Sequence, residues 1–259
     1  MNYYGRIEQP SPILNVNQKL WTFDPAKNIS KPYLWDVDII KGPPDNVSIF
    51  QANVQDQVAI GLRLDRVNQN NSDVWTTLHI RQDLHGQSLD AVFRSEISLM
   101  VFPTFHLWFD PNTHSPENAF GIEINDGTNL LWFVFADGPT ETFQLPHHRI
   151  VLTQTPLNEW STRTVDIATQ WKDAGWTEPD SLSFILILGT TLLHPGTWVG
   201  YFSNLSVNVA PYQAENLSSG ARLAIIIVDA VVILGLASIT LLMERGQGKR
   251  SGGRWRSKA

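Results

Sequence analysis

The stretch Ala119–Ala136 reads AFGIEINDGTNLLWFVFA and predicts a β-hairpin. Two apolar, β-rich runs, Ala119–Ile124 and Leu130–Ala136, flank the polar residues Asn125–Asn129. The Asp-Gly pair within these polar residues is a turn signal, because it supplies the positive φ that tight hairpin turns require. A tight turn joins strands that run in opposite directions. The stretch therefore indicates an antiparallel sheet.

Short β-rich runs separated by turn residues continue on both sides of this hairpin, from Ile13 to Val209. One helix is expected, around Ala168–Ala174. Strands at this spacing with almost no helix predict an all-β protein, an antiparallel jelly-roll sandwich of about twelve strands over residues 13–210. Besides the hairpin, the expected strands are Tyr33–Ile40, Ser48–Ala52, Val58–Leu64, Val74–Ile80, Glu96–Phe102, Thr140–Leu145, Ile150–Thr155, Arg163–Ile167, Leu182–Leu188 and Trp198–Val209.

The carboxy-terminal half of this region resembles a known fold family. The segments Thr164–Ile167, Trp171–Trp176, Phe184–Leu188 and Gly196–Val207 are similar to the last strands of concanavalin-like jelly rolls, which include carbohydrate-binding modules and lectin-like domains. The resemblance implies a β-sandwich and a glycan ligand. Ser203 departs from the family, which usually has Asp there, and this leaves the family's structural calcium open.

Residues Leu223–Met243 read LAIIIVDAVVILGLASITLLM, with one ionisable side chain in 21 residues. A helix of this length crosses a hydrocarbon core of about 30 Å, so we expect a transmembrane helix. The tail 244–259 carries six basic residues and one acid, and the linker 211–222 carries one of each. Basic residues stay on the cytoplasmic side, which predicts a cell-membrane protein with a cytoplasmic tail and an extracytoplasmic domain.

The start of the chain does not match this orientation. An exported amino-terminal domain needs a signal peptide, and the expected arm 1–12 has neither a basic nor an apolar signal region. Two explanations remain: the true start lies upstream, or the domain stays inside and the helix is a tail anchor. The charge of the tail favours the first.

Composition narrows the choice of partners. Residues 1–220 hold 12 basic and 23 acidic residues, a net charge of −11. This acidity argues against nucleic acid and anionic lipid headgroups as partners of the domain, and it suits a cation, a neutral glycan or a basic partner. The chain has no cysteine, so no disulfide contributes to its stability.

Five N-x-S sequons agree with an outside location and are candidate glycosylation sites: Asn28, Asn46, Asn70, Asn204 and Asn216.

Ten tryptophans suggest either a filled core or platforms for sugar rings. We expect the tryptophans within strands to fill the core, namely Trp35, Trp75, Trp108, Trp132 and Trp198. The tryptophans at turns are the candidates for exposed ligand contacts, and Trp160 and Trp176 are named as such. The family resemblance implies instead that Trp171 and Trp176 cap the core.

The loop Phe109–Asn118 is the best recognition loop in the sequence. Asp110, Asn112, Glu117 and Asn118 offer oxygen ligands that would suit a glycan or Ca²⁺, although no fixed calcium spacing is met. A solvated polar loop is the alternative.

An enzyme has less support. A glycosidase needs two acids about 5–10 Å apart, and Glu123 with Asp126 lacks the spacing of jelly-roll glucanases. The segment Arg94–Glu96 is similar to a strand of jelly-roll alginate lyases, from which Ile97 departs. We therefore name no catalytic residue.

Asp229 lies inside the expected membrane helix. A carboxylate there costs about 2.5–3.5 kcal/mol and normally faces a partner, which indicates contact with another transmembrane subunit. The alternative is a protonated acid, or one that reaches the outer interface.

Three functions are compatible with the sequence as a whole: a surface glycan- or ligand-binding protein, an accessory subunit of a membrane complex, and a polysaccharide-acting hydrolase or lyase. The sequence supports the surface-binding function slightly better than the accessory subunit.

Overall fold

The computed structural model describes residue 14 and residues 21–40, 45–67, 76–110, 115–191 and 195–208. The chain divides into two units, Met1–Ala210 and Pro211–Ala259, and all described residues belong to the first. No helix among them is long and apolar enough to cross a membrane. The expected membrane helix Leu223–Met243 lies outside the described residues, so its prediction stays a prediction.

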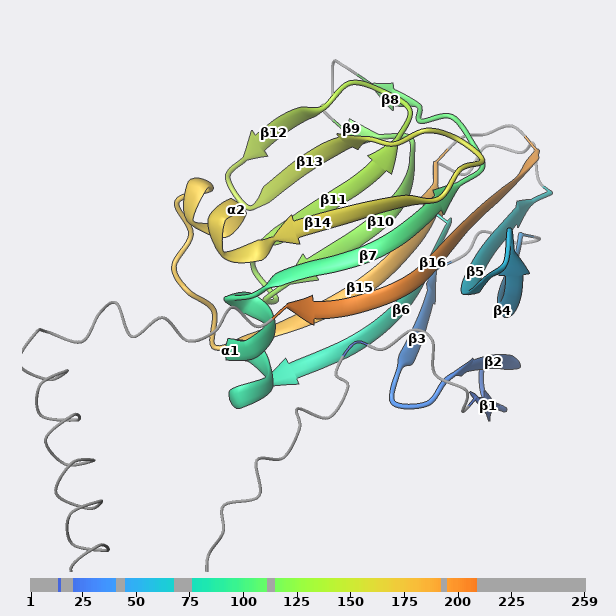
Figure 1. Ribbon diagram of the computed structural model, residues 1–259, viewed down its shortest axis with the longest axis horizontal. Helices are drawn as coiled ribbons and strands as arrows, with labels where there is room; N and C mark the ends of the chain where they lie inside the picture. The colour runs from blue at the N-terminus through green and yellow to red at the C-terminus, as the bar shows by residue number, and fades with distance from the viewer. Residues whose placement is uncertain are drawn as a thin grey trace, which may run out of the picture. The chain divides into compact units, whose positions relative to one another are not determined.

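The described residues form an all-β sandwich of two main sheets (Figure 1). The seven-stranded sheet has the order β12-β13-β11-β10-β15-β6-β3, and the five-stranded sheet has the order β14-β7-β16-β5-β4. These twelve strands match the expected number, and two small two-stranded sheets, β1-β2 and β8-β9, add to them. The strands of the seven-stranded sheet are β3 (Asp36–Ile40), β6 (Thr76–His85), β10 (Asn118–Asn125), β11 (Leu130–Ala136), β12 (Glu141–Leu145), β13 (His148–Gln154) and β15 (Ser181–Thr190). The remaining elements are β1 (Trp21–Asp24), β2 (Ile29–Pro32), β4 (Asn46–Val54), β5 (Gln57–Arg66), α1 (Gln87–Phe93), β7 (Glu96–Pro103), β8 (Phe109–Asp110), β9 (Ser115–Pro116), β14 (Ser161–Asp166), α2 (Ile167–Asp173) and β16 (Gly196–Asn208).

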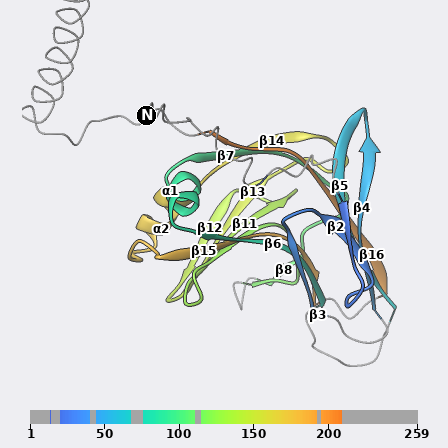
Figure 2. The same ribbon diagram turned by 90° about the horizontal axis from the view of Figure 1, so that it is seen from below.

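The chain passes repeatedly from one sheet to the other, as in a jelly roll. After β3 it enters the five-stranded sheet for β4 and β5, returns for β6, and crosses again for β7. Later, β14, β15 and β16 alternate between the two sheets. Figure 2 shows the two sheets as two curved layers, with β7 and β14 in one and β6 and β11 in the other. Many consecutive strands therefore lie in different sheets, and most pairings join strands that do not follow one another in the chain.

The core lies between the two sheets because alternate residues of each strand point inward. Phe120 on β10 packs so closely on β16 that a Cβ at Gly200 would lie 2.3 Å from its ring. Trp35 is fully buried and contacts Phe184 edge to face, with ring centroids 6.4 Å apart. Burying side chains of this size contributes about 1.5–3 kcal/mol each, and this is how a sandwich without cysteine is stabilised.

The predicted hairpin is confirmed. β10 and β11 pair antiparallel, with Asn125 opposite Leu130. The Asp126 carboxylate accepts the backbone N–H groups of Thr128 and Asn129, at 2.8 and 2.6 Å. Gly127 has φ +90°, the positive value for which glycine was expected. The expected helix is also confirmed as α2, whose N-cap Asp166 accepts the N–H of Thr169.

Three expectations need correction. The sandwich is not wholly antiparallel, because β13 inserts between β12 and β11 and runs parallel to β11. A second helix, α1, follows β6; its Leu89, Val92 and Phe93 are buried at the i, i+3, i+4 spacing of one helix face. The strand expected from Tyr33 begins only at Asp36, because Leu34 has φ +70° and turns the chain.

Candidate functional site

The outer face of the seven-stranded sheet, which points away from the core, carries the polar groups that concern function. Because side chains alternate along a strand, the inward residues of β6 such as Leu78 and Ile80 leave a polar set facing outward. The antiparallel registers align this set with outward residues of β3, β15 and β10. The outward residues of these four strands include Asp36, Asp38, Thr77, His79, Arg81, Asp83, Ser183, Glu123 and Asn125.

One end of this face is covered. Leu107 packs on an apolar cluster formed by Ala119, Val134, Ala136, Ile150 and Leu152. This covering segment is His106–Trp108, and it is held in place by the side chains of Asn118, at the start of β10, and Asp137, directly after β11. Asn118 accepts the N–H of Trp108 at 2.7 Å and donates to the carbonyl of His106 at 2.8 Å, and Asp137 accepts the N–H of Leu107 at 3.1 Å.

The other end of the outer face is open and hollowed. A cleft of about 300 Å³ lies where β6 ends, β15 begins and the β10–β11 hairpin turns. Most of its lining side chains can donate or accept hydrogen bonds. We call it the outer-face cleft, and it is lined by Asp83, His85, Asn125, Asp126, Gly127, Ser181, Leu182 and Ser183.

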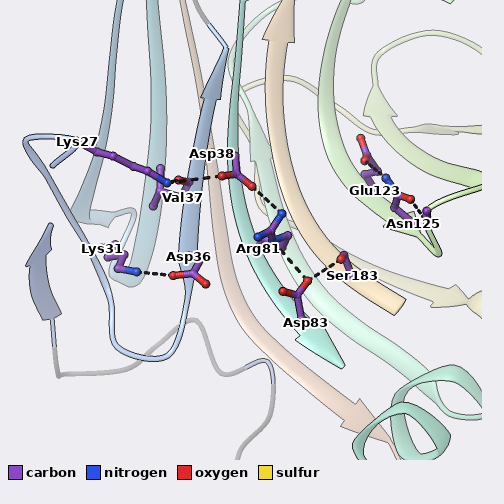
Figure 3. A network of polar contacts seen from close by, with 11 residues as sticks. Lys27, Lys31, Asp36, Val37, Asp38, Arg81, Asp83, Glu123, Asn125 and Ser183 are labelled. Carbon is purple, nitrogen blue, oxygen red and sulfur yellow. Dashed lines mark hydrogen bonds and ion pairs between the residues drawn. The ribbon is translucent and has the colours of Figure 1, made fainter. Parts of the chain in front are cut away.

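A chain of charged contacts leads across the face to this cleft (Figure 3). Lys27 lies 3.5 Å from Asp38, whose other oxygen lies 2.9 Å from an Arg81 nitrogen. Arg81 Nε lies 3.4 Å from Asp83 Oδ1, and that oxygen also accepts the Ser183 hydroxyl at 2.6 Å. The cleft carboxylate of Asp83 is thus oriented by a guanidinium on its own strand and a hydroxyl on the next.

Glu123 lies beside the cleft and is only 5% exposed. Its Oε2 accepts the indole N–H of Trp132 at 2.9 Å, and its Oε1 accepts the amide of the cleft residue Asn125 at 3.3 Å. Burial raises the pKa of Glu123 above its usual value, and the two hydrogen bonds counteract part of that rise. Asp126, whose spacing from Glu123 had argued against a catalytic acid pair, is engaged by the backbone of its own turn.

Several buried polar atoms of this face have no hydrogen-bond partner among the described residues. They include the hydroxyl of Thr77 and the Nε2 atoms of His79 and His148. Burial lowers the pKa of His79 to about 4, against the opposing effect of Asp38, and it lowers the pKa of His148 as well. Both imidazoles are therefore neutral at physiological pH. Each can donate one hydrogen bond from one ring nitrogen and accept one at the other.

The tryptophans divide differently from the expectation. Trp35 and Trp198 are buried, as predicted. Trp108 is 58% exposed, which corrects its expected place in the core, because it lies at the end of the segment that covers the outer face. Trp132 is partly buried on the outer face, beside Glu123 and against the apolar cluster there, which also corrects its expected place in the core. Trp75 lies outside the described residues.

The two tryptophans expected to bind ligand pack against different parts of the sandwich. Trp160 donates to the carbonyl of Val54 and packs on Phe102 at the five-stranded sheet. Trp176 donates to the carbonyl of Pro146 and contacts Trp171 edge to face, and Trp171 is buried as the family resemblance implied.

The recognition loop is described in part. Asn118 is buried and holds the covering segment, and the backbone carbonyl of Glu117 accepts the hydroxyls of Thr190 and Thr191. The backbone of Asp110 pairs with Ser115, and Asn112 lies outside the described residues. The described residues contain no group of three or more His, Asp or Glu side chains that could hold a metal ion.

The sequons and the membrane acid are placed as follows. Asn28, Asn46 and Asn204 are exposed on the surface. Asn70, Asn216 and Asp229 lie outside the described residues. Glycosylation and the intramembrane contact therefore stay predictions.

Sequence reasoning missed the residues of β6 that lead to the cleft. The signal was present, since the run TTLHIRQDLH from Thr76 to His85 alternates polar residues with Leu78, Ile80 and Leu84. Alternation of this kind predicts a strand with one polar face. It could not identify the partner Ser183, which lies one hundred residues away in the chain.

No protein-family model matches the chain, and no curated protein matches it. Among solved structures it is similar to a family 11 carbohydrate-binding module from Clostridium thermocellum in complex with a β-1,3-1,4-mixed-linked tetrasaccharide, with 12% identity, 70% of this chain and 91% of that chain covered, and a TM-score of 0.36. It is also similar to the xyloglucanase domain of NopAA from Sinorhizobium fredii in complex with cellobiose (15% identity, 68% and 93% covered, TM-score 0.38). A third is the endoglucanase Cel12A from Rhodothermus marinus (13% identity, 68% and 96% covered, TM-score 0.35). These TM-scores are too low for the likeness to assign a function or a site to this chain.

Proposed function

We propose that this chain binds an uncharged glycan in the outer-face cleft, and that a carboxy-terminal membrane helix displays the sandwich on the extracytoplasmic side of a cell membrane. The observation that carries the binding proposal is the cleft itself. It gathers carboxylate, amide, hydroxyl and imidazole groups from three strands and one hairpin turn within about 300 Å³. Such a set of donors and acceptors matches a ligand with several hydroxyl groups.

The charges of the cleft favour an uncharged ligand. Asp83 and Asp126 line it, and the nearby cation Arg81 is already paired with Asp38 and Asp83. An anionic sugar would meet these carboxylates at short range, where like charges repel. A neutral sugar hydroxyl can instead donate to a carboxylate and accept from an amide N–H.

The membrane part of the proposal rests on the sequence. Leu223–Met243 has the length and the near-absence of charge of a membrane span, and the basic tail after it indicates a cytoplasmic carboxy terminus. The three exposed sequons agree with an outside domain.

The experiment is a binding screen of the full-length chain in detergent against an array of neutral oligosaccharides, including cellobiose and the mixed-linkage β-1,3-1,4 tetrasaccharide. We expect at least one member to bind, and Asp83→Ala and Ser183→Ala to weaken that binding. The matched control is Asp56→Asn, an exposed acid in the turn between β4 and β5. If no neutral oligosaccharide binds, or if the cleft variants bind as well as the control, the proposal is wrong.

A second candidate is an accessory subunit of a membrane complex. It is favoured by Asp229, because a leucine would insert at that position more easily than a carboxylate. The two functions are compatible, since one concerns the sandwich and the other the membrane helix.

A further inference from the structure

Glu123 is a buried acid that does not itself line the cleft, and both of its hydrogen-bond partners are neutral donors. Trp132 donates from one side at 2.9 Å and Asn125 from the other at 3.3 Å. A carboxylate is the side chain of this size that offers two acceptor atoms and no donor. The pair of donors therefore favours the ionised form of Glu123, although burial disfavours charge there.

Asn125 links this acid to the cleft. Its Oδ1 accepts the N–H of Gly127 at 2.7 Å, which places its Nδ2 toward Glu123. An amide has two N–H donors, and only one of them points to Glu123. The amide of Asn125, which lines the cleft, is thus held in one of its two possible orientations, with the nitrogen as the donor end.

We propose that Glu123 is a positioning residue of the outer-face cleft, which acts through Asn125 to present an amide N–H donor to a sugar hydroxyl and so couples binding to its own ionisation. This inference rests on the proposed glycan function. The inference identifies Asn125 as the hydrogen-bond donor of the cleft, whereas Asp83 is a hydrogen-bond acceptor there.

The consequence is a pH-dependent affinity. When Glu123 is protonated, one of its oxygens carries a hydrogen. That O–H then opposes the N–H of either Trp132 or Asn125, and two donors cannot bond to each other. Binding then weakens as the pH falls through the pKa of Glu123, which burial has raised. The charged and titratable groups on the elements around it are Arg81, two strands away in the same register row, Asp126 in the hairpin turn, and His148, whose ring contacts Trp132.

Glu123→Gln tests the coupling, because glutamine keeps the size of the side chain but replaces one acceptor with a donor. We expect the variant to bind the mixed-linkage tetrasaccharide, or whichever array member binds better, about 5- to 10-fold more weakly at neutral pH, which is the loss expected for one hydrogen bond. The variant should also lack the fall in affinity that the wild type shows toward acid pH. The matched control is Glu141→Gln, an exposed glutamate on β12 of the same sheet, which should keep both the affinity and the pH profile.

A second readout needs no glycan. In the full-length chain labelled with ¹⁵N-tryptophan, the indole N–H resonance of Trp132, assigned by its loss in Trp132→Phe, should shift with pH in the wild type and not in Glu123→Gln. A Trp132 resonance that does not titrate, or a Glu123→Gln variant with wild-type affinity and pH profile, overturns the positioning role. Absence of any glycan binding at any pH, with the Trp132 titration intact, overturns the proposed function and leaves only the contact between Glu123 and Trp132 established.

Discussion

Breaking the buried ion pair between Arg66 and Asp45 from one side should strongly destabilise the sandwich. The two side chains are 3% and 2% exposed, and Arg66 Nε lies 3.1 Å from Asp45 Oδ2. The same carboxylate accepts the hydroxyl of Thr76 at 2.7 Å and the N–H of Val67 at 3.1 Å. It therefore joins residues at the ends of β4, β5 and β6, and its contacts with Arg66 and Thr76 are buried.

Asp45→Ala removes the carboxylate and leaves its donors inside. Removing one partner of a buried pair costs about 3–5 kcal/mol of unfolding free energy. A domain of this size loses about 2–4 °C per kcal/mol, so the midpoint of thermal unfolding should fall by about 6–20 °C. The measurement is chemical and thermal denaturation of the full-length chain, followed by near-ultraviolet circular dichroism.

The control is Asp65→Asn, which removes a half-exposed pair with Arg63 and should cost no more than about 1 kcal/mol. The double variant Asp45→Ala with Arg66→Met should be less destabilised than Asp45→Ala, because it buries no uncompensated charge. If Asp45→Ala costs no more than the control, the pair does not lie in a desolvated site and the reasoning fails.

The same residue predicts a pH dependence. Burial would raise the pKa of Asp45, but the hydrogen bonds from Thr76, Val67 and Arg66 together hold it below its usual value. A carboxyl with a lowered folded-state pKa stabilises the fold above its unfolded pKa, about 3.9, and this contribution is lost as the pH falls through the folded value. Stability should therefore decline below about pH 4 more steeply in the wild type than in Asp45→Ala.

Three further predictions follow from packing and from the sequence. Gly200→Ala should destabilise the fold by about 1–3 kcal/mol in denaturation, because its Cβ would overlap Phe120, whereas Gly138→Ala, with its nearest neighbour at 3.9 Å, should be tolerated. Protease added to intact cells should remove the sandwich and leave the basic tail protected, and protection of the whole chain would reverse the topology. Asp229→Leu should weaken co-purification of a partner membrane subunit without altering export, and wild-type assembly of this variant would remove the main support for an accessory subunit.

The cleft and its chemistry depend on pairings that local sequence does not encode. Asp83 meets Ser183, and Trp132 meets His148, because whole strands align in one register. The insertion of β13 between β11 and β12 could not be read from the sequence either, since a tight turn signals only that β12 and β13 are neighbours. Trp108 has the same apolar neighbours in sequence as a core residue, but its place on the covering segment leaves its ring in solvent.

The sequence by itself determined features whose cause lies within a few residues. Asp126 and Gly127 specify the hairpin turn because only a short polar cap and a residue free to adopt positive φ are needed there. Alternation along Thr76–His85 determined that one face of β6 is polar. Only the tertiary structure decided what that face meets, because sheet register is set by the burial of many distant side chains at once, and a shift of one residue would turn Glu123 into the core.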